Sequence, residues 1–266
     1  MCFYKDNIIR IVNENNVTEL DFKDWIMLSD DCGDGLKKWL KFKAGDYPDP
    51  DCVLKQNAPE CVVVELNWYS EAEASDKYYI DCIFSFATFF KAFLRYYAGE
   101  YMPYLGRVYE NYDKLFGDKY KNKFCEDQNI ERKVLDTLLE QLNIFARNTH
   151  TLGNYMPCPD DEYNTIKGNY YKYKDRLEKL YKDIQDSSKK EHNWSSWFDE
   201  EKIEELGLAN ILENKELLKF TFNGKKMRKE DIKPYTEYIK TINAIIEERG
   251  KMLAGHFWAK RSKQLQ

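Results

Sequence analysis

One short stretch of this chain gathers the side chains that could do chemistry. Residues 147–159 read Arg-Asn-Thr-His-Thr-Leu-Gly-Asn-Tyr-Met-Pro-Cys-Pro, and His150 is one of only three histidines. Arg147 and His150 would share one face of a helix that continued that far. An imidazole can act as a general base near neutral pH, and a guanidinium binds phosphate through paired hydrogen bonds. The pair predicts phosphoester cleavage without a metal, with His150 as the base and Arg147 holding phosphate.

The same stretch carries amide, hydroxyl and aromatic side chains that could bind a ligand. These candidate binding residues are Asn148, Thr149, Thr151, Asn154 and Tyr155. The alternative needs no ligand, because the stretch would then only end a helix, with Gly153 and Asn154 in a turn that favours positive φ. The two threonines would satisfy the backbone groups that a helix end leaves unpaired.

A second candidate binding segment lies further along the chain. Trp258, Lys260 and Arg261 interleave aromatic and cationic side chains, a composition typical of nucleic-acid contacts. Residues 215–266 carry 13 basic and 6 acidic side chains, a net of +7, whereas the whole chain has a formal net charge of -5. We expect a nucleic acid or protein partner to bind through this basic segment. The alternative is that the cations only complement the C-terminal end of a helix.

Helices are expected to position these residues. Apolar residues three or four apart predict a central buried helix over 76–97 and an amphipathic helix over 131–147. A long helix is expected over 232–262, with Pro234 in its first turn and Arg249 among the apolar residues of one side. Residues 99–117 are expected to form a tyrosine-rich connector.

Two short strands complete the expected architecture. They are predicted near residues 61–66, a β-branched run, and near 218–227, where Asn223-Gly224 is typical of a hairpin turn. The predicted fold class is therefore α+β, predominantly helical. Residues 1–266 are expected to form a single globular domain, in which residues 1–60 could be a small mixed lobe.

Composition argues against several classes of protein. The seven cysteines include no pair at zinc-ligand spacing, so we expect no metal and a reducing cytoplasmic compartment. No phosphate-binding loop or dinucleotide fingerprint is present, so we expect no cofactor. The richest apolar run is too short for a bilayer and the chain begins with no secretory leader, so no membrane partner is expected.

Residues 151–159 are part of a longer pattern. They are followed by Tyr163-Asn164, by Lys167-Gly168 and by a helix from Asp175, and the segment Ile245–Gly250 completes the set. This pattern resembles a family of uncharacterised bacterial proteins whose loop reads Thr-Ile/Leu-Gly-Asn-Phe/Tyr-x-Pro-x-Pro. The family has no established activity, so the resemblance implies a relative and not a reaction.

Two hypotheses on function follow from these residues. The first is a soluble, mainly helical bacterial protein of the cytoplasm that binds or regulates a partner through residues 147–159. A defence or mobile-element locus is one setting in which such a protein would work. The second is a metal-independent ribonuclease or phosphoesterase that uses His150 and Arg147.

Overall fold

The computed structural model describes residues 35–41, 79–99, 105–149, 151–158, 200–214 and 227–264. Most of these residues are helical, which confirms the predominantly helical prediction. The strands expected near 61–66 and 218–227 lie outside the described residues, apart from Met227 at the end of the second. Of the lobe expected over residues 1–60, only residues 35–41 are described.

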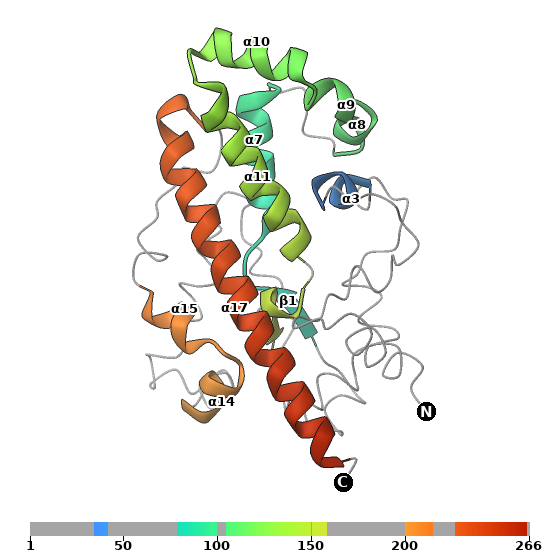
Figure 1. Cartoon of the computed structure of the whole chain (residues 1–266), viewed down its shortest axis with the longest axis vertical. Helices are drawn as coiled ribbons and strands as arrows, with labels where there is room; N and C mark the ends of the chain where they lie inside the picture. The colour runs from blue at the N-terminus through green and yellow to red at the C-terminus, as the bar shows by residue number, and fades with distance from the viewer. Residues whose placement is uncertain are drawn as a thin grey trace.

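Three helices form the framework of the molecule. They are α7 (Phe86–Tyr97), α11 (Arg132–Asn148) and α17 (Ile232–Gln264). Figure 1 shows α11 beside α17, with α7 behind them. The 33 residues of α17 give it a length of roughly 50 Å. The other helices of the described ranges are α3 (Gly35–Lys41), α8 (Leu105–Glu110), α9 (Tyr112–Leu115), α10 (Asp118–Gln128), α14 (Glu200–Glu205), α15 (Ala209–Glu213) and the short 3-10 helices η2 (Leu152–Asn154) and η3 (Lys229–Asp231).

The aromatic face of α7 is the centre of the core. Four of its phenylalanines are buried almost completely: Phe86, Phe89, Phe90 and Phe93. Three neighbouring helices place large rings against them: Trp39 of α3, Phe145 of α11, and Tyr235 and Tyr238 of α17. Burying one phenylalanine contributes about 2 kcal/mol. This cluster therefore fixes α3, α11 and α17 around α7, and it confirms the expectation of a central buried helix.

The start of that central helix differs from the prediction. Residues Tyr79–Cys82 form strand β1, which pairs antiparallel with β2 (Tyr155–Cys158), and α7 begins only at Phe86. The N–H of Ile83 extends the ladder by donating to the Asn154 carbonyl at 2.7 Å. The prediction of a helix from residue 76 is therefore wrong for residues 79–85. Local spacing carries no information on a partner strand that lies more than seventy residues further along the chain.

The tyrosine-rich connector expected over 99–117 also contains more structure than predicted. It includes α8 and α9; α8 packs against α3, and Tyr97 of α7 contacts the end of α9. The Tyr97 hydroxyl donates to the Leu115 carbonyl at 2.7 Å, and its ring stacks on Phe116 at 5.8 Å. Helices this short are marginal by themselves, so these tertiary contacts explain why they form.

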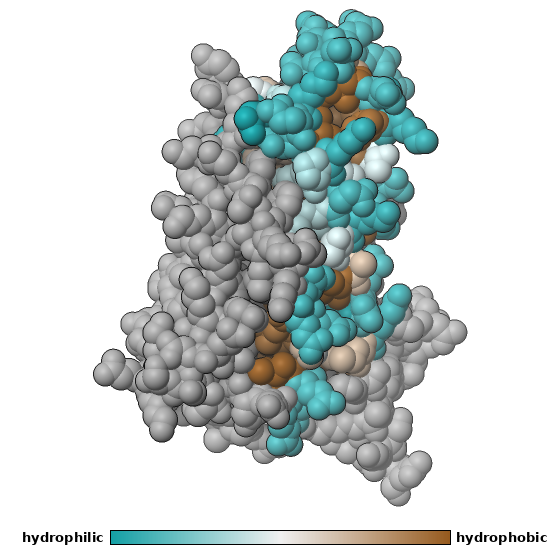
Figure 2. Space-filling model, turned by 90° about the vertical axis from the view of Figure 1, so that its left-hand side faces the viewer, coloured by the Kyte–Doolittle hydropathy of each residue, from teal (hydrophilic) through white to brown (hydrophobic). Residues whose placement is uncertain are grey.

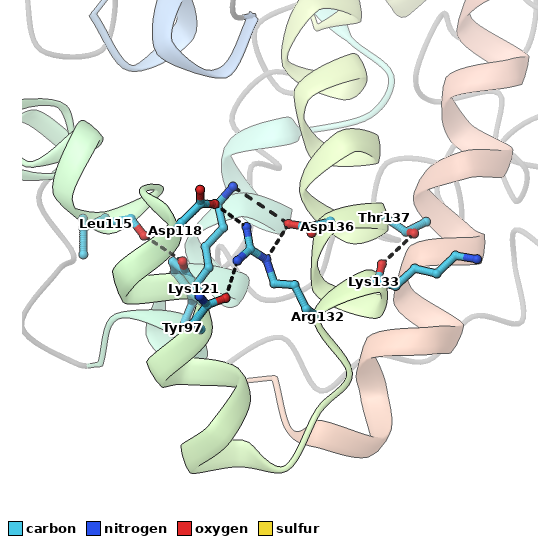
Figure 3. Close-up of polar contacts among 9 residues, drawn as sticks. Tyr97, Leu115, Asp118, Lys121, Arg132, Lys133, Asp136 and Thr137 are labelled. Atoms are coloured by element: carbon cyan, nitrogen blue, oxygen red, sulfur yellow. Dashed lines mark hydrogen bonds and ion pairs between the residues drawn. The ribbon is translucent and has the colours of Figure 1, made fainter.

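A charged network joins α10 to the start of α11 (Figure 3). The Arg132 guanidinium donates to Asp118 at 2.7 Å and to Asp136 at 2.9 Å, and it also contacts Asn122. Lys121 lies 3.9 Å from Asp136. The hydrogen bond from Arg132 lowers the pKa of Asp118. Because the two carboxylates are exposed and the two cations only partly buried, the network orients the two helices and adds little stability.

The described surface on the side seen in Figure 2 is mostly hydrophilic, with hydrophobic residues in separate smaller patches. No helix within the described ranges is long and apolar enough to cross a membrane. Within the same ranges, no three His, Cys, Asp or Glu side chains are grouped as metal ligands would be.

A turn that leaves α11 rests directly on α17. This turn is η2 (Leu152–Asn154), and a Cβ atom added to Gly153 would overlap the Ile246 carbonyl oxygen and lie 2.8 Å from the Gly250 nitrogen. Among the described residues, positive φ occurs at Asn129, Gly99 and Gly207, and not at Gly153. The expectation of a positive φ at Gly153 is therefore wrong. A glycine is needed here because two backbones meet without room for a side chain.

Replacing Gly153 tests this contact. Gly153→Ala should lower the free energy of unfolding by about 3 kcal/mol, because the new methyl group meets backbone atoms of α17 that cannot move independently. Urea denaturation measures the change. Gly106→Ala is the matched control, since a Cβ at Gly106 has no atom within 4 Å. Equal stability of the two variants would show that η2 and α17 are not in tight contact.

Candidate functional site

The candidate site begins where α11 ends. Asn148 is the last residue of α11, and Thr149 keeps helical φ and ψ of -57° and -40°. His150 lies outside the described residues, and the chain is described again from Thr151 through η2 into β2. The pairing of Arg147 with His150 therefore stays a prediction.

The two threonines complete the hydrogen bonds of the helix end. Thr149 Oγ1 donates to the Phe145 carbonyl at 2.8 Å, and Thr151 Oγ1 donates to the Asn148 carbonyl at 2.9 Å. Both residues are buried, with 5% and 4% of their surface exposed. They satisfy carbonyls that the end of a helix leaves unpaired, as the alternative of a simple helix end predicts.

Asn148 uses its side chain to reach α17. Its Nδ2 atom donates to Glu247 Oε1 at 3.2 Å, and the asparagine is buried. Asn243 lies one turn before Glu247 on α17, and its Nδ2 atom donates to the Gln141 carbonyl at 3.0 Å. These two contacts supplement the apolar packing between α11 and α17 with polar ones, which fixes how the helices are placed along each other.

Asn154 is completely buried, and both ends of its amide are used. Oδ1 accepts from the Phe84 N–H at 3.0 Å, while Nδ2 donates to the Phe84 carbonyl at 3.0 Å and to the Thr149 carbonyl at 2.9 Å. The Cys82 thiol donates to the same Thr149 carbonyl at 3.2 Å. The amide therefore links the start of α7 to the end of α11, and it fixes the backbone that immediately precedes His150.

A buried guanidinium supports the same turn from α17. Arg249 donates through Nη1 to the Gly153 carbonyl and through Nε to the Leu206 carbonyl, each at 2.7 Å. Burial lowers the pKa of Arg249 to about 9, so the side chain is still protonated at neutral pH. One charged group thus holds η2 and the turn between α14 and α15 against α17.

Arg147 differs from its neighbours because it is exposed. It lies in the last turn of α11, and its aliphatic stem covers Gly35 at the start of α3. One turn earlier on the same face, Asn143 Oδ1 accepts a hydrogen bond from the Leu36 N–H at 2.9 Å. Arg147 therefore presents a cation at the junction between α3 and α11.

The structure describes only the backbone of the remaining candidate residues. Tyr155 is the first residue of β2 and pairs with Cys82 of β1. Trp258, Lys260 and Arg261 lie in the C-terminal part of α17, so the helix expected over 232–262 is confirmed there. The binding role of these four residues stays a prediction.

Several residues of the site escaped the sequence analysis. The roles of Gly35, Asn143 and Glu247 depend on contacts with segments about a hundred residues away in the chain, which no local pattern reveals. Arg249 did leave a signal, because an arginine on the apolar side of a helix must find partners in the core. Cys82 gave none, since a scattered cysteine usually behaves as a small apolar residue.

Comparisons with protein-family models, with curated proteins and with solved structures find no match to this chain. The family resemblance of residues 151–159 therefore stays a prediction. What the site can do has to follow from its own geometry. That geometry is an exposed guanidinium on a support whose buried polar groups bond to one another.

Replacing Asn154 tests the support. Asn154→Ala should lower the free energy of unfolding by about 3 kcal/mol, because it leaves the N–H and the carbonyl of Phe84 buried and unpaired and removes one of the donors to the Thr149 carbonyl. Asn154→Asp should cost more at neutral pH, since its carboxylate would face two carbonyl oxygens in a buried site. Urea denaturation at several pH values measures both changes.

The free energy of unfolding of Asn154→Asp should also depend on pH. Burial and the two carbonyls would raise the pKa of its carboxyl group in the folded state above the unfolded value of about 3.9. The folded state then binds more protons than the unfolded state, so the extra cost should disappear as the pH falls below about 4. A constant difference between the two variants across the acid range would contradict the hydrogen bonds described for Asn154.

Proposed function

We propose that this chain is a binding or regulatory protein that recognises RNA at the end of α11 through Arg147. The observation that carries the proposal is the difference in solvent exposure among residues 147–154. Arg147 is exposed, whereas Asn148, Thr149, Thr151 and Asn154 are buried and bonded within the chain. Because the backbone that carries this cation is already ordered, binding does not have to order it, which favours a ligand contact.

The charge around Arg147 suits an anionic partner. The last two turns of α11 contain no acidic residue, and α3 contains none either. A guanidinium donates paired hydrogen bonds to a phosphate group, so Arg147 could bind one from the last turn of α11.

The basic segment of α17 is the second contact in this proposal. Trp258 would stack on a base, and Lys260 and Arg261 would pair with phosphates. The buried side chains of Asn148, Thr149, Thr151 and Asn154 would shape the site and not touch the RNA, and Tyr155 would be a further contact. We also propose that the chain is a single α+β domain related to the bacterial family that residues 151–159 resemble. It would act in the cytoplasm, in a defence or mobile-element locus.

Removing the exposed guanidinium tests the proposal. Arg147→Ala should weaken binding of a fluorescein-labelled polyuridine RNA about tenfold at low salt, the loss expected for one charged hydrogen-bonded contact. It should also reduce the slope of log K against log salt by about one, because one fewer counterion is released. Fluorescence anisotropy measures both quantities.

Lys133→Ala is the matched control for this measurement. Lys133 is an exposed cation in the first turn of the same helix, far from the end that carries Arg147. It should leave the affinity unchanged. An equal loss in the two variants would point to general electrostatic attraction, and no loss in Arg147→Ala would reject the proposed contact.

A second candidate function, a metal-independent ribonuclease, is favoured by the fixed backbone on both sides of residue 150. Thr149 and Thr151 are each held by hydrogen bonds within the chain, and both follow the exposed Arg147 closely in the sequence. Rigid placement of a general base is a requirement for efficient proton transfer. His150 would abstract a proton, and Arg147 would stabilise the charge that develops on the phosphate.

The ribonuclease hypothesis has a direct test. The purified chain should cleave a labelled RNA in the presence of EDTA, and His150→Ala should reduce the rate at least a hundredfold, the usual effect of removing a general base. Gel electrophoresis of the products measures the rate. His192→Ala is the control and should leave the rate unchanged. Intact RNA at a large excess of protein would reject the hypothesis while leaving RNA binding open.

A further inference from the structure

The N-terminal residue of α3 lies directly beneath the stem of Arg147. A Cβ atom added to Gly35 would overlap Arg147 Cγ, and it would lie 3.0 Å from Arg147 Cδ and 2.9 Å from the Asn143 carbonyl oxygen. Two of these atoms belong to the first part of the arginine side chain and the third to the backbone of α11. A side chain at position 35 therefore cannot be accommodated by moving only the guanidinium end of Arg147.

A separate hydrogen bond holds α3 in this position. The Leu36 N–H donates to Asn143 Oδ1 at 2.9 Å, although the two residues are 107 positions apart in the chain. Leu36 and Trp39 of α3 are both buried in the core, and the Trp39 ring meets Phe86 of α7 at 4.7 Å. The start of α3 is thus fixed by packing and by a hydrogen bond, independently of Arg147.

From these contacts we infer that Gly35 is a positioning residue for Arg147. The glycine provides the space in which the arginine stem lies, so α3 sets the direction in which the guanidinium meets an anionic group. This inference rests on the proposed function, because it assigns a role to α3 at the same site. It makes the site a joint product of α3 and α11, two segments that the sequence separates widely.

The test is a double-mutant cycle on RNA binding. Gly35→Ala should displace the Arg147 stem and weaken binding of the labelled polyuridine RNA about fivefold, somewhat less than Arg147→Ala does. In the Arg147→Ala background the same substitution should have no effect, because the group that it displaces is gone. A substitution that only disturbs the fold would lower the affinity in both backgrounds.

Two further variants keep the result open to contradiction. Gly106→Ala is the control for a glycine replacement in open space and should bind RNA as the original chain does. If Gly35→Ala does not fold, Asn143→Ala provides a second route, because it releases the start of α3 without adding atoms. It should weaken RNA binding about threefold, and only when Arg147 is present.

The outcomes separate this inference from the proposed function. An unchanged affinity in Arg147→Ala would reject the RNA contact itself, and the role of Gly35 with it. If Arg147→Ala weakens binding while Gly35→Ala does not, or if the two losses simply add, the contact stands and the role of Gly35 is rejected.

Discussion

The side-chain amide of Asn154 is the contact on which the described site depends. It accepts a hydrogen bond from the Phe84 N–H and donates to the carbonyls of Phe84 and Thr149. The Cys82 thiol also donates to the Thr149 carbonyl. Because the backbone of residues 79–84 is used in this way and in the β1–β2 pair, α7 can begin only at Phe86. That starting point places the phenylalanine face of α7 against α3, α11 and α17. The Asn154 amide thus helps to fix where α7 begins and hence which helices its phenylalanines contact.

The described polar residues of the segment 147–159 fall into two groups, those that are buried and one that is exposed. Most of them hold the turn in shape, with Arg249 and the close backbone contact of Gly153 adding support from α17. Arg147 alone among the described candidates of this stretch presents its side chain to solvent. Buried polar groups are costly unless paired, and here the pairing is built from backbone carbonyls that the end of α11 supplies. Such a support gives the exposed cation a defined position.

The sequence predicted the parts of the fold that depend on local spacing. The helix over 131–147 and the buried side of the long C-terminal helix are both confirmed, since their apolar residues recur every three or four positions. Strand β1 was missed because its partner strand lies far along the chain, and the two short helices after α7 were missed because contacts with α3 and with Tyr97 hold them. The polar residues of the site were recognised, but their partners were not. Gly35, Phe84 and Glu247 each come from another segment, and no local pattern connects them to residues 147–154.

The support of η2 has a consequence for how the chain acquires its shape during synthesis. Arg249 and Gly153 are 96 positions apart, and the backbone atoms that Gly153 touches also belong to α17. Residues 147–154 therefore leave the ribosome well before the helix that holds them. A nascent chain can form the contacts between α7 and α11 early, but the turn beyond α11 stays without its main support until α17 has emerged. Any activity that depends on this turn is thereby reserved for chains in which the middle of α17 has left the ribosome.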